Sequence, residues 1–155
     1  MKLSRSMEFL PATEAHARDM APRLRAADVR ELDALGIDAT WALASGVAAS
    51  REPVTAMVEG RPAVMFGIAE GSILTGMGRP WLLGTDAVVG RDVAMARESR
   101  RWLERMAVGF RLLSNVVDAR NVRAIRWLRW LGFELHEPVP LGPFGFPFHV
   151  FERRL

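Results

Sequence analysis

The hydrophobic pattern of the first fifty residues predicts helices, because charged residues and alanines are interleaved there and β-branched residues are few. Thr13 is placed to cap the first helix, Pro22 interrupts it, and Gly36 is a good stop for the second. The elements expected in this part are a short strand at Met7–Leu10 and helices over residues 14–24, 25–35 and Ala39–Ser50.

At Pro53 the pattern changes to short runs of apolar residues, which favour strands. Two strands, Val54–Val58 and Ala63–Ala69, are separated by the tight turn Glu59–Pro62, so a β-hairpin is expected. A glycine-rich link, GSILTGMGR, leads to a third strand at Pro80–Thr85. The three strands together predict a meander.

From Asp92 the apolar positions recur at helical spacing and predict a helix of about five turns. Arginines lie toward the opposite side of this helix. Its apolar face holds Val93, Ala96, Leu103, Ala107 and Phe110. A strand at Leu112–Ala119 follows it.

The next stretch, DARNVRAIRWLRWLGFEL, predicts a capped helix with a glycine stop. Asn121 can accept a hydrogen bond from a free amide of the first turn, and Gly132 can end the helix in the left-handed conformation. Its arginines recur every three residues, so they wind around the helix and form no straight basic face. Further strands are expected at Phe133–Leu135 and Phe148–Glu152, and four phenylalanines of the tail are expected to close one side of the core.

The composition indicates one folded domain over residues 1–155. Half of the residues are apolar and a quarter are charged, which is the balance of a soluble globular protein. The net charge is only +3, and Lys2 is the lone lysine among 21 basic residues. Nucleic-acid-binding proteins usually show a concentrated basic face, so this charge argues against that class.

The residues do not support a disulfide, a cysteine-based site, a metal site or a membrane span. There is no cysteine, so disulfides, thiolate nucleophiles and cysteine metal ligands are excluded. His16, His136 and His149 lie far apart, and we expect no metal site. The N-terminal residues lack the apolar stretch of a secretory signal, and no run reaches the ~18 apolar residues of a membrane span, so we expect the protein in the cytoplasm or inside a particle assembled there.

The predicted order of elements resembles the GNAT N-acetyltransferase fold. The most specific match is the last third, where Asn121 starts a helix that ends in the leucine-glycine-phenylalanine of residues 131–133. The resemblance implies one α/β (α+β) domain with a mixed, mainly antiparallel sheet flanked by helices. A closer resemblance, over Met20–Glu152, is to phage-encoded proteins of GNAT-like fold related to the internal virion protein A of T7-like phages. It rests on RPAVMFGIA, PWLLGT, SRRWLERM and NVVDARN.

The resemblance to GNAT N-acetyltransferases implies acetyl-CoA as a cofactor that lies along the strand matched by Trp81 to Thr85. The pyrophosphate is expected on backbone amides at the start of the following helix. The residues expected to contact the cofactor are Leu82, Leu83, Gly84, Thr85, Arg91 and Asn121. For PWLLGT the alternative is an ordinary central strand, and for Asn121 it is a helix cap alone.

The phosphate loop departs from the family pattern, which has Gly three residues after an Arg or Gln and Gly or Ala two residues later. Here Arg91 is followed by Ala94 and Ala96. Because the β-carbon of alanine obstructs close phosphate approach, the resemblance implies a degenerate loop. The stretch GRDVAMARES is also more typical of a continuous helix than of a phosphate-binding loop.

Glu70 and Asp118 are the candidate general bases, because an amine nucleophile must lose a proton. His136 is a weaker third choice, and structural salt bridges are the alternative for both carboxylates. The chain has no tyrosine, so protonation of the departing thiolate needs another acid or water.

Three functions remain open from the sequence. The leading one is a phage-encoded GNAT-like enzyme that transfers an acetyl group from acetyl-CoA to an unknown amine acceptor. The second is a non-catalytic virion or assembly protein that binds other phage virion proteins. The third is nucleic-acid binding through Arg120, Arg123, Arg126 and Arg129, with Trp127 and Trp130 stacking on bases; a solvated helix face is the alternative.

Overall fold

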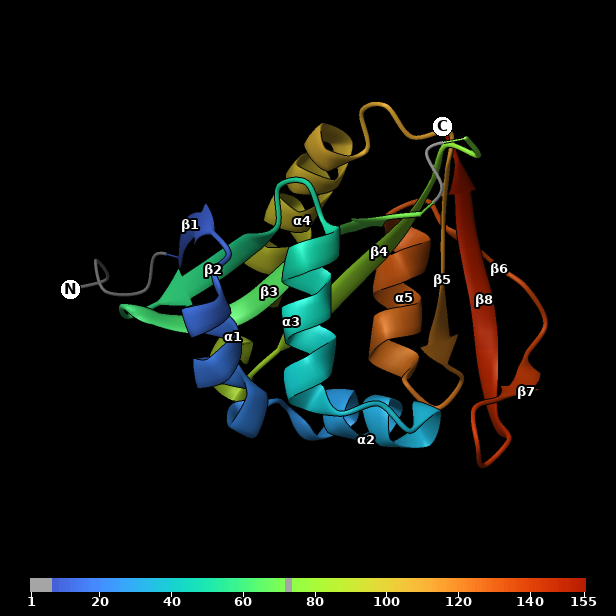
Figure 1. Cartoon of the computed structure of the whole chain (residues 1–155), viewed down its shortest axis with the longest axis horizontal. Helices are drawn as coiled ribbons and strands as arrows, with labels where there is room; N and C mark the ends of the chain where they lie inside the picture. The colour runs from blue at the N-terminus through green and yellow to red at the C-terminus, as the bar shows by residue number, and fades with distance from the viewer. Residues whose placement is uncertain (1–6, 72–73) are drawn as a thin grey trace.

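The computed structural model describes residues 7–71 and 74–155, in which eight strands form one sheet (Figure 1). The strand order is β1-β2-β3-β4-β5-β8-β6, and β7 pairs with β8. Only the β4–β5 pair in this part of the chain is parallel. The strands are β1 (Met7–Pro11), β2 (Val54–Val58), β3 (Arg61–Glu70), β4 (Met77–Gly84), β5 (Leu112–Asp118), β6 (Glu134–Leu135), β7 (Val139–Leu141) and β8 (Phe146–Arg154).

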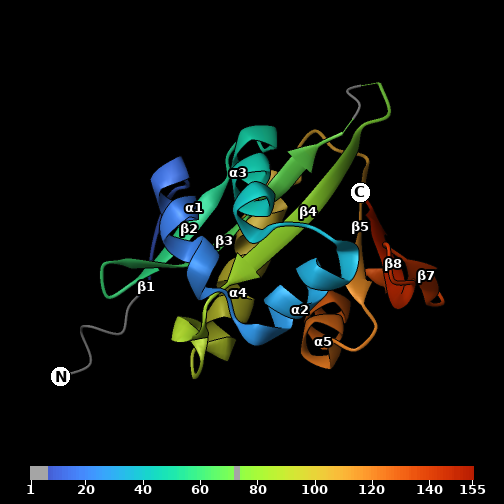
Figure 2. The same ribbon diagram turned by 60° about the horizontal axis from the view of Figure 1, so that its bottom comes forward.

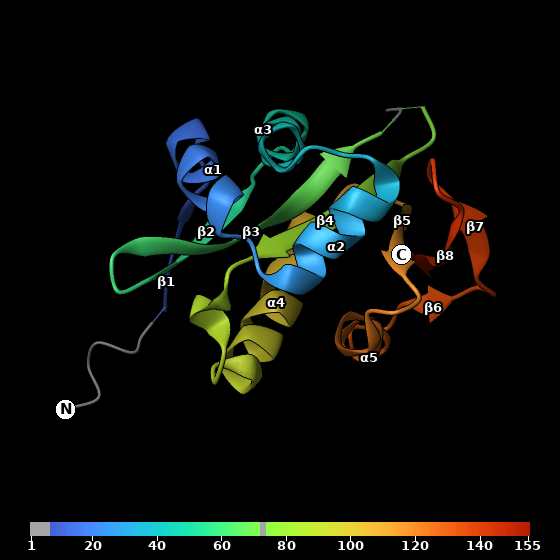
Figure 3. The same cartoon turned by 90° about the horizontal axis from the view of Figure 1, so that it is seen from below.

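Helices cover both faces of this sheet. Seen from below in Figure 3, α1 and α3 lie on one side of the sheet and α4 and α5 on the other. Helix α2 runs across the lower end of the molecule in Figure 1 and comes forward in Figure 2. The helices are α1 (Glu14–Met20), α2 (Ala26–Leu35), α3 (Ala39–Ala49), α4 (Asp92–Met106) and α5 (Val122–Trp130). Within the described ranges, no helix has the length and apolar character needed to cross a membrane.

Local capping interactions explain why most predicted helix boundaries are confirmed. The side chains of Thr13, Asp38 and Asn121 each accept a hydrogen bond from the backbone N–H three residues further on. Gly36 ends α2 with a φ of 70°, and Gly132 follows α5 with a φ of 92°. Both conformations are left-handed and cost glycine little.

The β2–β3 hairpin has a shorter turn than the sequence predicted. Arg61 and Pro62 already belong to β3, so Glu59 and Gly60 make the turn, with φ values of 52° and 75°. Two consecutive residues with positive φ match the twist of the flanking strands. The predicted four-residue turn is therefore wrong by two residues.

The long helix is also shorter than predicted. It has 15 residues and ends at Met106, because Gly109 turns the chain toward β5 with a φ of 94°. Phe110 consequently lies outside the helix. Val93 is 73% exposed in the first turn, so it does not share the buried face with Leu103.

The tail contributes fewer aromatic rings to the core than expected. Phe148 and Phe151 are buried, but Phe144 is 68% exposed and Phe146 lies on the surface. Both exposed rings lie at the turn end of the hairpin formed by β7 and β8. Strand β7 was not predicted, because Pro140 obscures its pattern; proline is tolerated in edge strands.

Separate apolar clusters hold the two layers of helices on the sheet. The cluster on the side of α4 and α5 includes Leu103, Leu113, Val117, Ile125, Leu128 and Phe151. The cluster on the side of α1 and α3 includes Met20, Leu32, Leu43, Met65 and Leu83. A third cluster lies around β2 and β3 and includes Val54, Phe66 and Val88. Burial of these side chains, at about 25 cal/mol per Å², is the main force that fixes the elements in place.

Candidate active site between strands β4 and β5

Strands β4 and β5 separate soon after they begin. Parallel pairing is confined to Met77 with Leu112 and Gly78 with Leu113, whereas β3 pairs with β4 along its whole length. Figure 1 shows the two strands diverging toward the end that α2 crosses. At the start of the opening, the Asn115 side-chain amide donates to the Pro80 carbonyl oxygen over 2.8 Å.

The alternation of backbone groups along β4 shows which residue faces this opening. The Thr85 N–H donates to Ala63 O on β3, whereas the Pro80 carbonyl accepts from Asn115 on the opposite side. Because successive residues of a strand direct their N–H and C=O groups to opposite edges, Leu82 shares the edge of Pro80. Its N–H and C=O therefore point into the opening, where no partner lies within the described residues.

Helix α2 closes the far end of the opening with two carboxylates one turn apart. The Gly84 N–H, at the end of β4, donates to Asp28 Oδ2 over 2.8 Å. The Asp118 N–H, at the end of β5, donates to Glu31 Oε1 over 2.7 Å. The Arg25 N–H also donates to Gly84 O. Since side chains three apart lie on one helical face, α2 bridges the ends of both separated strands.

Both α2 carboxyls are harder to ionise than usual. Burial raises the pKa of Asp28, against the opposing effects of Arg25 and the Gly84 N–H. Burial also raises the pKa of Glu31 to about 7, and the negative charges of Asp28 and Asp118 add to the increase. Glu31 can therefore exchange a proton near neutral pH, as a general base requires.

Asp118, a predicted base, is held by Arg120. Its carboxyl is almost fully buried and accepts hydrogen bonds from Arg120 Nη2 (2.7 Å), Nε (3.0 Å) and the Arg120 N–H (2.8 Å). Burial raises the pKa of Asp118, but the hydrogen bonds from Arg120 outweigh it and hold the pKa below its usual range. A carboxylate stabilised in this way is a weak proton acceptor.

The start of α4 presents free backbone donors. Gly90 has a φ of 84° directly before the helix, and the first intrahelical bond runs from the Met95 N–H to Arg91 O. The N–H groups of residues 92–94 therefore remain available at the positive end of the helix dipole. Arg91 Nη1 donates to Ala87 O, whereas its Nε is buried without a hydrogen-bond partner.

The remaining predicted residues take part in other contacts. Leu83 faces β3, and the Thr85 hydroxyl donates to Ala63 O, so neither lines the opening; Asn121 caps α5. Glu70 lies opposite Gly78, at the paired end of the strands, and forms an ion pair with Arg51 over 2.7 Å. The structure thus keeps Glu70 at the opposite end from Asp118. His136 Nε2 lies 3.1 Å from Glu152.

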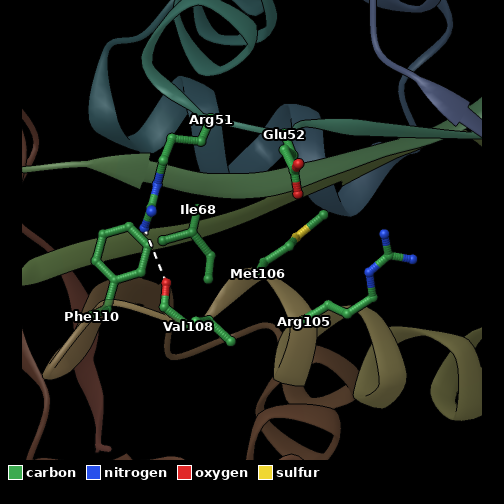
Figure 4. Close-up of a pocket in the computed structure, with 7 residues that line it drawn as sticks. All are labelled: Arg51, Glu52, Ile68, Arg105, Met106, Val108 and Phe110. Atoms are coloured by element: carbon green, nitrogen blue, oxygen red, sulfur yellow. Dashed lines mark hydrogen bonds between the residues drawn. The ribbon is translucent and has the colours of Figure 1, made fainter.

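Two hollows lie near this sheet. The pocket of about 370 Å³ in Figure 4 lies beside Arg51 and Phe110, at the Glu70 end, where Arg51 Nη2 donates to Val108 O over 3.3 Å. A larger open trough of about 620 Å³ lies between α2 and the β7–β8 hairpin, with Arg120 in its wall. Of these two hollows, the trough is the one lined by Arg120, which binds Asp118 at the end of β5.

Comparisons with known proteins bear on the fold. No family model and no curated protein matches the chain. The chain is similar to an acetyltransferase of the GNAT family from Streptococcus pneumoniae, with 12% identity, a TM-score of 0.66, and coverage of 97% of this chain and 99% of that one.

Two similar structures contain coenzyme A in its free or acetylated form. The protein yncA from Salmonella typhimurium, with its cofactor acetyl-CoA, has 16% identity and a TM-score of 0.67 over 96% of this chain and 94% of that one. AAC(6')-Ib in complex with ribostamycin and coenzyme A has 19% identity and a TM-score of 0.68 over 96% and 93%. The chain therefore has the GNAT fold, a mixed and mostly antiparallel sheet with one parallel β4–β5 pair, flanked by helices.

Proposed function

We propose that this chain transfers an acetyl group from acetyl-CoA to an amine. The observation that carries the proposal is the opening between β4 and β5, where Leu82 presents an unpaired N–H and C=O. An extended ligand can pair with such an edge as an added strand. The structures of yncA and AAC(6')-Ib, which share the fold, hold acetyl-CoA and coenzyme A respectively.

The residues present fit this cofactor at two points. Leu82 would pair with the amide-containing pantetheine arm, and the free N–H groups of residues 92–94 would bind the pyrophosphate. The unsatisfied Arg91 Nε adds a buried donor beside them. Asp92 carries an unfavourable negative charge there, but an ion pair with Arg123 offsets it.

The expected degeneracy of the phosphate loop has no support in this geometry. Ala94 and Ala96 lie within α4, where a helical backbone needs no positive φ. The Ala94 N–H is one of the free donors whatever side chain the residue carries. We therefore infer a competent anion site at the start of α4.

For the chemistry, acetyl-CoA would supply a thioester whose acetyl carbon bonds to the amine nitrogen while the C–S bond breaks and the thiolate takes a proton from water. The amine must lose a proton before or during attack. We assign that proton to Glu31, because among the described carboxyls it combines a pKa near neutrality with a place at the far end of the opening, which α2 closes. Asp118 and Arg120, which bind each other, would hold the end of β5 against Glu31.

Calorimetric titration with acetyl-CoA tests the proposal, with ATP as a control for phosphate binding alone. Leu82→Pro removes the N–H that faces the opening without removing a bond to β3, and Leu82→Ala is the matched control that keeps the N–H. We expect about fivefold weaker binding for the proline variant than for the alanine variant, since one hydrogen bond contributes about 1 kcal/mol. Equal affinities would contradict pairing along β4.

The other functions expected from the sequence remain predictions. No observation on this fold supports a relation to phage virion proteins. A non-catalytic scaffold is the function to test next if millimolar acetyl-CoA does not bind. Nucleic-acid binding would show an affinity that falls steeply with salt concentration, which the same purified protein can test.

A further inference from the structure

Helices α4 and α5 lie side by side on one face of the sheet and are linked through their side chains (Figure 3). At the start of both helices, Arg123 forms an ion pair with Asp92. About two turns further on, Arg100 Nη2 of α4 donates to Trp130 O of α5 over 3.1 Å. The two helices therefore run in the same direction and share one outer surface, on the side away from the sheet.

The net positive charge of the chain is concentrated in these two helices. They hold seven arginines against three acids, a net charge of +4, whereas the whole chain has +3. The rest of the chain is therefore slightly negative. A charge of +3 spread over a whole domain argued against nucleic-acid binding, but the packing of α4 beside α5 gathers this charge on one surface.

Three arginines of this surface are exposed and free to bind a ligand. Arg97, Arg126 and Arg129 have no hydrogen bond or ion pair within the residues that the structure describes. Arg97 lies three residues before Arg100, and Arg126 lies four residues before Trp130, so each pair shares one side of its helix. We call Arg97, Arg100, Arg126, Arg129 and Trp130 the basic face.

An exposed aromatic ring belongs to the basic face. Trp130 is 44% exposed, and the Arg100 guanidinium lies 4.0 Å from the centre of its ring. This contact orients the indole while part of it stays open to solvent. By contrast, Trp127 is half-buried against α4 and Arg120 binds Asp118, so neither of these sequence candidates belongs to the face.

The chemistry of the basic face fits a single-stranded nucleic acid. Guanidinium groups match the geometry of phosphate oxygens, and the flat side of an indole stacks on an unpaired base. In a duplex the bases are already stacked on one another. A membrane takes up an amphipathic helix by its apolar side, and that side is buried in the core at Leu103, Ile125 and Leu128.

We propose that the basic face binds a single-stranded polynucleotide. Its free arginines bind phosphates along the backbone, and Trp130, held by Arg100, stacks on one base. The proposal is independent of the acetyltransferase function. It also uses different groups from the cofactor, because the free N–H groups of residues 92–94 lie about one turn before Arg97 on α4.

Fluorescence anisotropy of the full chain with labelled oligothymidylate or oligouridylate, without acetyl-CoA, tests the binding. Saturable binding of either supports the proposal, and comparing the two shows whether the sugar contributes. Three phosphate contacts predict that the logarithm of the association constant falls against the logarithm of salt concentration with a slope of about −2, since each contact contributes about −0.7. No saturable binding at about 50 mM salt, or an affinity that does not change with salt, would overturn the proposal.

Matched variants locate the site. Arg97→Gln and Arg126→Gln should each weaken binding about eightfold at about 50 mM salt and make the slope shallower by about 0.7. Arg154 is exposed and follows Arg153, which contacts Glu104 of α4, so Arg154 points to the other side of the sheet. Arg154→Gln should leave binding almost unchanged, and thermal unfolding checks that the variants fold. Equal losses in all three variants would show that total charge attracts the oligonucleotide, and would overturn the assignment.

The role of Trp130 distinguishes a nucleic acid from other anionic partners. Trp130→Leu keeps an apolar side chain but removes the stacking surface, so binding should weaken about fivefold with an unchanged salt slope. Phosphatidylserine vesicles and poly-glutamate represent a membrane and an acidic protein, and both should bind more weakly than oligothymidylate. Equal or tighter binding of either probe, or no effect of Trp130→Leu, would overturn the proposal.

Acetyl-CoA separates this inference from the proposed function. Saturating acetyl-CoA should leave oligonucleotide binding unchanged. Displacement of the oligonucleotide would place it on the free N–H groups of residues 92–94 and overturn the inference. Oligonucleotide binding by a chain that does not bind acetyl-CoA would overturn the proposed function and leave this inference standing.

Discussion

At the scale of single residues, the proposed acetyl transfer depends on whether the Glu31 carboxyl is protonated. Its pKa of about 7 predicts that kcat/KM falls below neutral pH, as the carboxyl becomes protonated and stops accepting a proton. Glu31→Gln should lower kcat/KM by about 100-fold or more and remove this acidic limb. The measurement is the pH profile of thiol release with acetyl-CoA. An unchanged profile in the variant would exclude Glu31 as the base, and exposed Glu134→Gln is the control.

The same residue should make stability depend on pH. A carboxyl whose folded pKa is about 7 and whose ordinary value is 4.5 binds more protons in the folded than in the unfolded state between those values. Stability is therefore lost as pH rises from about 5 to about 7. Glu31→Gln should be more stable than the parent chain at pH 8, by no more than about 3 kcal/mol, and nearly equal at pH 4. Urea unfolding at both pH values measures this, and a constant difference would contradict it.

At the scale of elements, the attachment of α2 to β4 depends on Asp28. Asp28→Ala leaves the buried Gly84 N–H without an acceptor, which should cost about 1–3 kcal/mol in the free energy of unfolding. Asp28→Asn keeps an acceptor oxygen and should cost less. Urea denaturation of both variants compares them. Equal losses would show that the charge, and not the hydrogen bond, holds α2 in place.

Elements whose boundaries depend on local chemistry could be predicted. The α5 helix is an example, because Asn121 caps it and Gly132, eleven residues further on, follows its end. Strand β7 was missed although its partners on β8 lie only five to nine residues further along the chain, because Pro140 interrupts its short apolar pattern. The early end of α4 was missed because Gly109 acts only through the turn that leads to β5.

At the scale of the whole molecule, the separation of β4 from β5 predicts a pattern of amide exchange. The Leu82 N–H faces the opening and should exchange rapidly in the free protein, whereas the neighbouring Leu83 N–H is bonded to β3 and should be protected. Acetyl-CoA should slow exchange at Leu82 specifically. Hydrogen exchange resolved by residue measures both, and strong protection of Leu82 before ligand is added would contradict an open edge.

The sequence alone determined where most helices and strands lie, because caps, glycine stops and hydrophobic periods act within a few residues of each other. Whether the strand at Pro80–Thr85 borders a site or is an ordinary central strand stayed open in the sequence. It did not distinguish the acids of α2. Asp28, Glu31 and Asp33 lie within six residues and look alike in sequence. Only the packing of α2 across the diverging ends of β4 and β5 makes Asp28 and Glu31 bond the strand ends and leaves Asp33 exposed. Burial and charge proximity then set their pKa values, and both depend on chain segments more than fifty residues away.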